Sequence, residues 1–263
     1  MGALFNNKDD KKGLHDTYRW FMKANTGYST PFPEVSNTRY ASLLEAACVV
    51  FEIRFNLIDL LNFVRDLKVN RTFNNMEANV MKGLQDPCTL DELGVFVLYH
   101  EAISHPFIQT IRSPGLEGFN ALDLGPFFLQ VKSHIKSLID APSLLLSSES
   151  DPSKAILGSL DSWHHPKAVA SVQEYAKTSD HIEELLLAFL SGALTTWERF
   201  MSEYNEDGLI SKLNEDLKAL AWTPSTNDAN EGALGLYRLY ARSNPRGTIL
   251  YFNSKAKFLK NNT

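Results

Sequence analysis

The stretch TRYASLLEAACVVFEIRFNLIDLLNFVRDL, residues 38–67, decides the fold class of this chain. Apolar residues recur in it at intervals of three or four, at Leu44, Ala47, Phe51, Phe55, Ile58, Leu61 and Val64. That spacing brings them to one side of an α-helix, whereas a half-buried strand alternates apolar and polar residues. The stretch therefore predicts one long helix with a buried apolar stripe.

Helical spacing continues along most of the remaining chain. Residues 95–99 are apolar almost all round, which favours a central, buried helix. A further helix is expected to place its apolar residues on one face, at Ile182, Leu186, Phe189, Ala193, Trp197, Phe200 and Tyr204. Residues 147–162, rich in Ser, Asp and Gly, predict a long exposed loop, and only Thr248–Phe252 has a strand-like pattern. The sequence predicts an all-α fold, or nearly so: a bundle-like set of helices with at most a short C-terminal strand.

The same patterns divide the chain into three parts. Residues 1–36 begin with charged residues and continue with Gly27, Pro31 and Pro33, which predicts a mobile lead-in and a connector. Residues 37–245 carry the helical patterns and are expected to form a single domain. In residues 246–263 basic and aromatic side chains alternate, which is typical of a tail.

Composition limits the class of protein. The chain has 263 residues, 44% of them hydrophobic and 22% charged, so a globular fold is expected. A net charge of −5 argues against a surface coated in basic residues but leaves a local basic patch open. Cys48 and Cys88 form no disulfide framework, and neither a signal peptide nor a membrane-length apolar run is present. We expect an intracellular protein away from membranes, with nucleus and cytoplasm both open.

No motif of the common enzyme classes occurs: the sequence contains no GxSxG, GxxxxGK[ST] or GxGxxG. Histidines were the first candidates for a metal site. His100 and His105 lie five residues apart, unlike the two histidines of HExxH, and His164 and His165 are adjacent, with no cysteine nearby to complete a site. The pattern favours ordinary buried or surface histidines, and an active enzyme with a site drawn from distant positions stays open.

One carboxylate stands out in the loop STNDANEGALG, residues 225–235. Asp228 is a good helix N-cap and Glu231 follows three residues later, so the two can form a capping box. The alternative is that Glu231 helps to hold Mg²⁺, which prefers carboxylate and phosphate oxygens. On local chemistry the cap is favoured.

Two segments resemble parts of hAT-like DDE transposases, which are RNase H-like enzymes. The sequence NTRYAS, residues 37–42, resembles the helix entry that follows the second catalytic Asp region of that family. Residues 225–232 resemble the segment that carries the third acidic residue, here Glu231. The family has a large helical insertion between the two, as this chain does, and related reading frames with GLQD (residues 83–86) occur in mushroom-type fungal genomes as transposon relatives.

The resemblance, over residues 37–245, implies a transposase-derived protein with Glu231 as a relic catalytic and metal-binding residue. Two earlier aspartates are needed for two-metal chemistry and nothing before Asn37 supplies them, so the chain would be catalytically incomplete. It would have no cofactor by itself, and Mg²⁺ only if the missing acidic residues were supplied. A nuclear location would follow.

DNA contact would come from basic residues near the C-terminus, which are Arg238, Arg242, Arg246, Lys255, Lys257 and Lys260. Equally, these residues can form a solvated tail. The alternative function is an intracellular helical interaction module without a nucleic-acid role, whose partner is another protein or a second copy of the chain.

Overall fold

The computed structural model describes residues 1–8, 13–27, 30–36, 41–112, 120–158, 160–226 and 228–260, with the backbone alone at 228–230 and 260. Within these ranges there is no β-strand, and the sole extended pairing is an isolated bridge between Asn120 and Pro224. The predicted all-α class is confirmed. The strand expected at Thr248–Phe252 is wrong, because a helix begins at Ile249.

The chain forms two compact units, one of residues 1–110 and 125–212 and the other of residues 111–124 and 213–263. This division differs from the three parts expected. The first 36 residues are not only a lead-in, because they contain helices α1 (Gly2–Phe5) and α2 (His15–Thr26). Phe5 and Tyr18 of these helices are fully buried in the first unit. The expected tail contains helix α14 (Ile249–Lys260).

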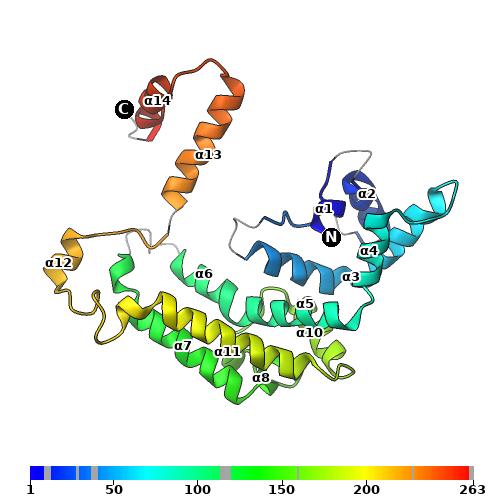
Figure 1. Ribbon diagram of the computed structural model, residues 1–263, viewed down its shortest axis with the longest axis horizontal. Helices are drawn as coiled ribbons and strands as arrows, with labels where there is room; N and C mark the ends of the chain where they lie inside the picture. Colours follow the sequence, from blue (N-terminus) through cyan, green and yellow to red (C-terminus); the bar gives the residue numbers. More distant parts are fainter. Residues whose placement is uncertain are drawn as a thin grey trace. The chain divides into compact units, whose positions relative to one another are not determined.

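Helices account for most of both units (Figure 1). The first unit continues after α2 with α3 (Ser42–Leu67), α4 (Asn75–Gly83), α5 (Pro87–Tyr99), the π-helix η1 (His100–Ser104), α6 (His105–Ile111), α7 (Gly125–Asp140), α8 (Ser143–Leu146), α9 (Pro152–Ala155), α10 (Pro166–Ala176), α11 (Ile182–Phe200) and η3 (Ser202–Tyr204). The second unit contains η2 (Ala121–Asp123), α12 (Glu215–Leu220), α13 (Asp228–Ser243) and α14. No helix among the described residues is both long and apolar enough to cross a membrane.

Helix α3 organises the first unit. It packs against α5 and α10, and also against α2 and α4 (Figure 1). Cys48 and Phe51 belong to one hydrophobic cluster, whereas Val50 and Leu57 belong to another. Since both sides of its first half are covered, α3 buries more than the single stripe expected.

Phe55 is a correction to that stripe, because 69% of it is exposed. The backbone of α3 leaves helical values at Ile53, where φ is −123° and ψ is 20°. Such a break changes the phase of the residues that follow, so positions counted from a regular period no longer share one face. In α11 the expected face is buried at Ile182 and Leu186.

Helix starts follow from local chemistry. The Asp86 side chain accepts a hydrogen bond from the Thr89 amide, and Pro87 occupies the first turn of α5. Asp86 is therefore the N-cap of this helix. Asn74 and Glu77 form a capping box at the start of α4.

The loop expected over residues 147–162 is only partly exposed. It contains α9, and Ala155, Ile156 and Leu157 are buried. The buried Gln173 amide in α10 donates to the carbonyl oxygens of Leu145 and Ser147, at 3.0 and 3.1 Å. Residues 147–162 therefore have the composition of a loop, but hydrogen bonds and apolar contacts from distant helices hold part of the segment in place.

Candidate metal-binding centre

A proline determines the backbone on which the centre is built. Pro106 lies in a continuous helical segment, where it has no amide hydrogen to donate to the carbonyl of Ala102. The segment changes to a π-helix over His100–Ser104 immediately before it. Single π turns inside α-helices are frequent at functional sites.

The carbonyl oxygen left free by Pro106 holds a second segment. The amide of Leu157 donates to the Ala102 oxygen at 2.8 Å. The chain continues from there to His164 and His165 at the start of α10, and the His165 amide donates to the Glu101 carboxylate at 2.9 Å. The π-helix and the α10 entry are thus joined at two points.

Glu45 of α3 connects both histidine-bearing segments. One of its carboxylate oxygens lies 3.1 Å from Nε2 of His100, and the other lies 3.1 Å from Nε2 of His165. These hydrogen bonds hold the pKa of Glu45 well below its usual range, and the same contact with Glu45 raises the pKa of His165. Glu45 is therefore ionised and forms a charge-assisted pair with His165.

Two more deeply buried side chains, Cys48 and Glu101, lie next to the Glu45–His165 pair. Glu101 is 1% exposed and Cys48 is fully buried, and the Cys48 thiol is 3.8 Å from Glu101 Oε1. Burial, together with the neighbouring carboxylates of Glu101 and Glu45, raises the pKa of the Cys48 thiol. Without a metal ion the sulfur is a protonated, unreactive thiol.

These side chains form two overlapping sets of ligand atoms. The ligand atoms of Glu45, His164 and His165 lie within 4.8 Å of one another, and so do those of Cys48, Glu101 and His165. Two ligand atoms, each about 2.1 Å from one zinc ion, lie about 3.4 Å apart at the tetrahedral angle. The 3.1 Å between Glu45 and His165 is close to that separation, so small side-chain movements suffice to admit an ion.

The charges around the centre are unequal. Glu45, Glu52 and Glu101 contribute three carboxyl groups, while the exposed Lys167 has its Nζ 4.0 Å from Glu52. His165 lies 4.0 Å from Glu52 through Nδ1. A partly buried excess of carboxyl groups favours a bound cation.

The ring of His100 is buried beside the centre, and only one of its two nitrogens is hydrogen-bonded among the described residues. It is 3% exposed, and its Nδ1 has no hydrogen-bond partner among the described residues. Because Nε2 faces Glu45, this nitrogen is left with a buried lone pair or a buried N–H, either of which is costly. A metal-ligating histidine commonly bonds a carboxylate through its other nitrogen. His100 makes such a bond to Glu45 but belongs to neither ligand set above.

The centre adjoins a pocket of about 240 Å³ whose lining includes Glu101, His105, His164, Trp163 and Leu160. The rings of His105 and His164 are stacked there, with centroids 3.9 Å apart. Burial, with the neighbouring imidazole of His164, lowers the pKa of His105 to about 4, so this ring is neutral at pH 7. A small molecule could reach the edge of the centre through this pocket.

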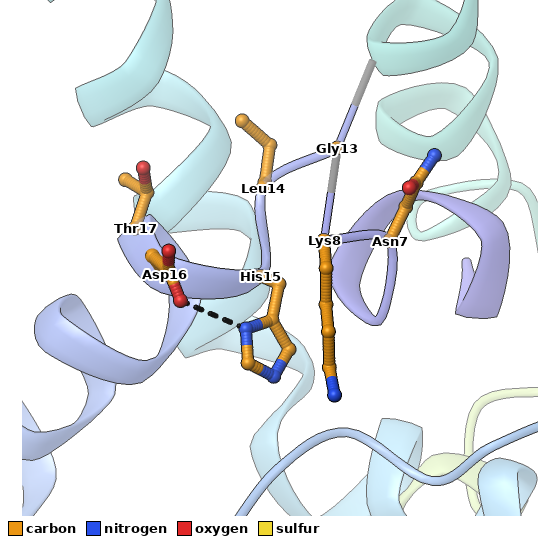
Figure 2. A pocket seen from close by; sticks show the side chains of 7 residues that line it. All are labelled: Asn7, Lys8, Gly13, Leu14, His15, Asp16 and Thr17. Carbon is orange, nitrogen blue, oxygen red and sulfur yellow. Dashed lines mark hydrogen bonds and ion pairs between the residues drawn. The ribbon is translucent and has the colours of Figure 1, made fainter. Parts of the chain in front are cut away.

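A second hollow lies near the N-terminus, lined by residues 7, 8 and 13–17 (Figure 2). It is about 80 Å³, and Figure 2 shows the His15 ring turned to the Asp16 carboxylate, with Nδ1 and Oδ1 2.9 Å apart. This pair is mostly open to solvent at Asp16 and gathers no third metal-ligand side chain among the described residues.

The residues singled out from the sequence lie elsewhere. Glu231 is exposed on α13 and belongs to no group of described His, Cys, Asp or Glu that could hold an ion. The side chain of Asp228, and with it the expected capping box, lies outside the described residues. Exposed basic side chains on or near α13 and α14 are Arg238, Arg242, Arg246, Lys255 and Lys257, while the side chain of Lys260 is not described.

Sequence reasoning weighed the histidines as two separate pairs and missed the carboxylates that join them. The spacing of His100 and His105 was judged against one regular α-helix, whereas the π turn changes which residues share a side. Glu45 and Glu101 lie within largely apolar helical stretches, and this placement could have indicated from the sequence that they are buried. A charged residue is rarely fully buried unless it has a partner.

Comparisons with protein-family models, with curated proteins and with solved structures find no match to this chain. Its function must be argued from the centre and from its surfaces.

Proposed function

We propose that this protein binds a divalent cation through Glu45, His164 and His165. The observation that carries the proposal is the convergence of these ligand atoms, from α3 and the α10 entry, within 4.8 Å of one another. Imidazole and carboxylate ligands suit Zn²⁺ and neighbouring transition metals. His164 is exposed and Glu45 partly so, which gives an ion a route from solvent.

Hydrogen bonding alone explains part of the arrangement, because Glu45 pairs well with His165. It leaves unexplained two further carboxyl groups beside His165, those of Glu52 and Glu101. A dication at Glu45 compensates the charge. The His100 ring then serves as a support that orients Glu45.

The test is calorimetric titration of the full chain with Zn²⁺. We expect a bound ion in the wild type. Glu45→Gln removes a proposed ligand, so its affinity should fall by more than the roughly 10- to 100-fold that altering an outer hydrogen-bonding partner of a ligand costs. His164→Asn changes an exposed residue and should weaken binding without loss of fold. Glu231→Gln is the matched control, because it makes the same chemical change in the other unit.

Equal affinities in the wild type, Glu45→Gln and His164→Asn would overturn this proposal. Loss of binding in Glu231→Gln alone would instead favour the metal site expected from the transposase resemblance.

A second function, contact with DNA, is proposed for the C-terminal helices of a transposase-derived protein. The supporting observation is a local charge opposite to that of the whole chain: Glu231 is the one acidic residue in 231–260, against five exposed basic side chains. Arg238 and Arg242 are four residues apart on α13 and so lie on the same side of it.

Measuring duplex DNA binding over a range of salt concentrations tests this function. Each phosphate contact contributes about −0.9 to the slope of log K against log salt. Replacing Arg238 and Arg242 by Gln should therefore reduce the slope by about 2. If the wild type binds no DNA at low salt, the DNA-contact function is overturned, and the alternative of a helical protein-interaction module is favoured.

A further inference from the structure

The deeper ligand set differs in chemistry from the one at the surface of the centre. It contains a sulfur, Cys48 Sγ, together with the buried carboxylate of Glu101 and the ring of His165. Cys48 and Glu101 face each other from α3 and the π-helix, so the set rests on regular backbone rather than on loops.

The spacing of this set fits coordination by a single ion. A zinc–sulfur bond of about 2.3 Å and a zinc–oxygen bond of about 2.1 Å place the two ligand atoms about 3.6 Å apart at the tetrahedral angle. The observed distance from Cys48 Sγ to Glu101 Oε1 is 3.8 Å. All three ligand atoms, the His165 nitrogen included, lie within 4.8 Å of one another.

We infer that Cys48, Glu101 and His165 bind a thiophilic divalent cation of the Zn²⁺ class, with Cys48 coordinated as the thiolate. This inference rests on the proposed function, because His165 belongs to both ligand sets and an ion bound to it can take its other ligands from the deeper set. It also names the class of cation, since Mg²⁺ and Ca²⁺ prefer oxygen ligands and would gain little from the sulfur. Binding breaks the S–H bond, forms a metal–sulfur bond and releases the proton to solvent. Three protein ligands leave a fourth position for water or a small molecule.

Replacing Zn²⁺ by Co²⁺ makes the sulfur visible, because a cobalt–thiolate bond absorbs in the near ultraviolet. The full chain is titrated with Co²⁺, and thermal stabilisation reports binding independently of the absorption. We expect the charge-transfer band in the wild type and in Cys88→Ser, and its loss in Cys48→Ser. Cys88 is the matched control, since it is the other cysteine of the chain and is exposed.

The outcomes separate the two proposals. Stabilisation by Co²⁺ without the band would overturn the thiolate inference and leave the proposed function standing. A band that disappears in Cys88→Ser but persists in Cys48→Ser would also overturn it. Neither stabilisation nor a band would overturn both.

Cys48→Ser places a hydroxyl at a fully buried position and can fail to fold. X-ray absorption of the zinc-loaded wild type needs no variant. We expect one sulfur neighbour at about 2.3 Å from zinc, and a shell of nitrogen and oxygen alone would contradict the inference.

Discussion

Helices α3 and α13 are both amphipathic, yet they differ in what covers them. Leu57, Leu60 and Leu61 of α3 are fully buried. Leu234, Leu236 and Leu239 of α13 are 63%, 56% and 63% exposed. The contacts of α13 with α14 are mostly aromatic, as in the ring pairs of Tyr240 and Tyr237 with Phe252.

The difference teaches that periodicity identifies a helix but not the burial of its apolar face. In α3, apolar residues and the polar residues Glu45 and Cys48 are packed by helices from three other parts of the chain. Hydrogen bonds from His100 and His165 lower the pKa of Glu45, whereas burial raises the pKa of the Cys48 thiol. Glu231 on α13 has no such surroundings among the described residues.

The largest effect should come from truncating one leucine in each helix. Leu57→Ala removes a fully buried side chain from α3 and should lower the free energy of unfolding by about 2–5 kcal/mol. Leu236→Ala in α13 should change it by no more than about 0.5 kcal/mol. Urea unfolding followed by circular dichroism measures both, and similar losses would show that α13 is as well covered as α3.

A smaller effect is expected from the buried amide that holds residues 145–158 in the first unit. Gln173→Ala removes two hydrogen bonds, to the carbonyls of Leu145 and Ser147, and should cost about 1–3 kcal/mol. Limited proteolysis should then cut more rapidly between residues 147 and 151. Unchanged cleavage would mean that apolar contacts at Ala155 and Leu157 suffice.

The second unit offers a matching amide in Asn120. Its Nδ2 donates to the Lys218 carbonyl at 2.9 Å, and its Oδ1 accepts from the amides of Leu122 and Thr223, both at 3.2 Å. Asn120→Ala should cost about 1 kcal/mol, less than Gln173→Ala, because nearby Thr223 is exposed and water can replace the lost partner. Hydrogen exchange at the Thr223 amide should become faster, and slower exchange would refute this role.

The smallest effect is a dependence on pH through His134 of α7. Burial lowers its pKa, and its Nε2 lies 3.0 Å from the Ala155 carbonyl oxygen. The unfolded chain protonates below about pH 6.5 while the folded ring stays neutral. The stability contribution is therefore complete above that pH and is lost as the pH falls toward the folded pKa. His134→Gln should reduce the loss of unfolding free energy between about pH 7 and pH 5, and an unaltered loss would contradict the assignment.

The sequence by itself determined the all-α class and several helix starts, because these depend on near neighbours. The spacing of Leu44, Ala47 and Phe51 identified α3, and the spacing of Ile182 and Leu186 identified α11. The Asp86–Pro87 pair starts α5 through contacts within one turn. Propensity, capping and amphipathic period all act over three or four residues, so they can be recognised in a linear string.

Only the tertiary structure decided where chemistry gathers. Glu45 and His165 are 120 residues apart in the chain, and Cys48 and Glu101 are 53 apart. They meet where the π-helix and the α10 entry are joined by the hydrogen bonds from the Leu157 amide to the Ala102 carbonyl and from the His165 amide to Glu101. Contacts over such separations depend on the packing of whole helices, and no local pattern encodes them.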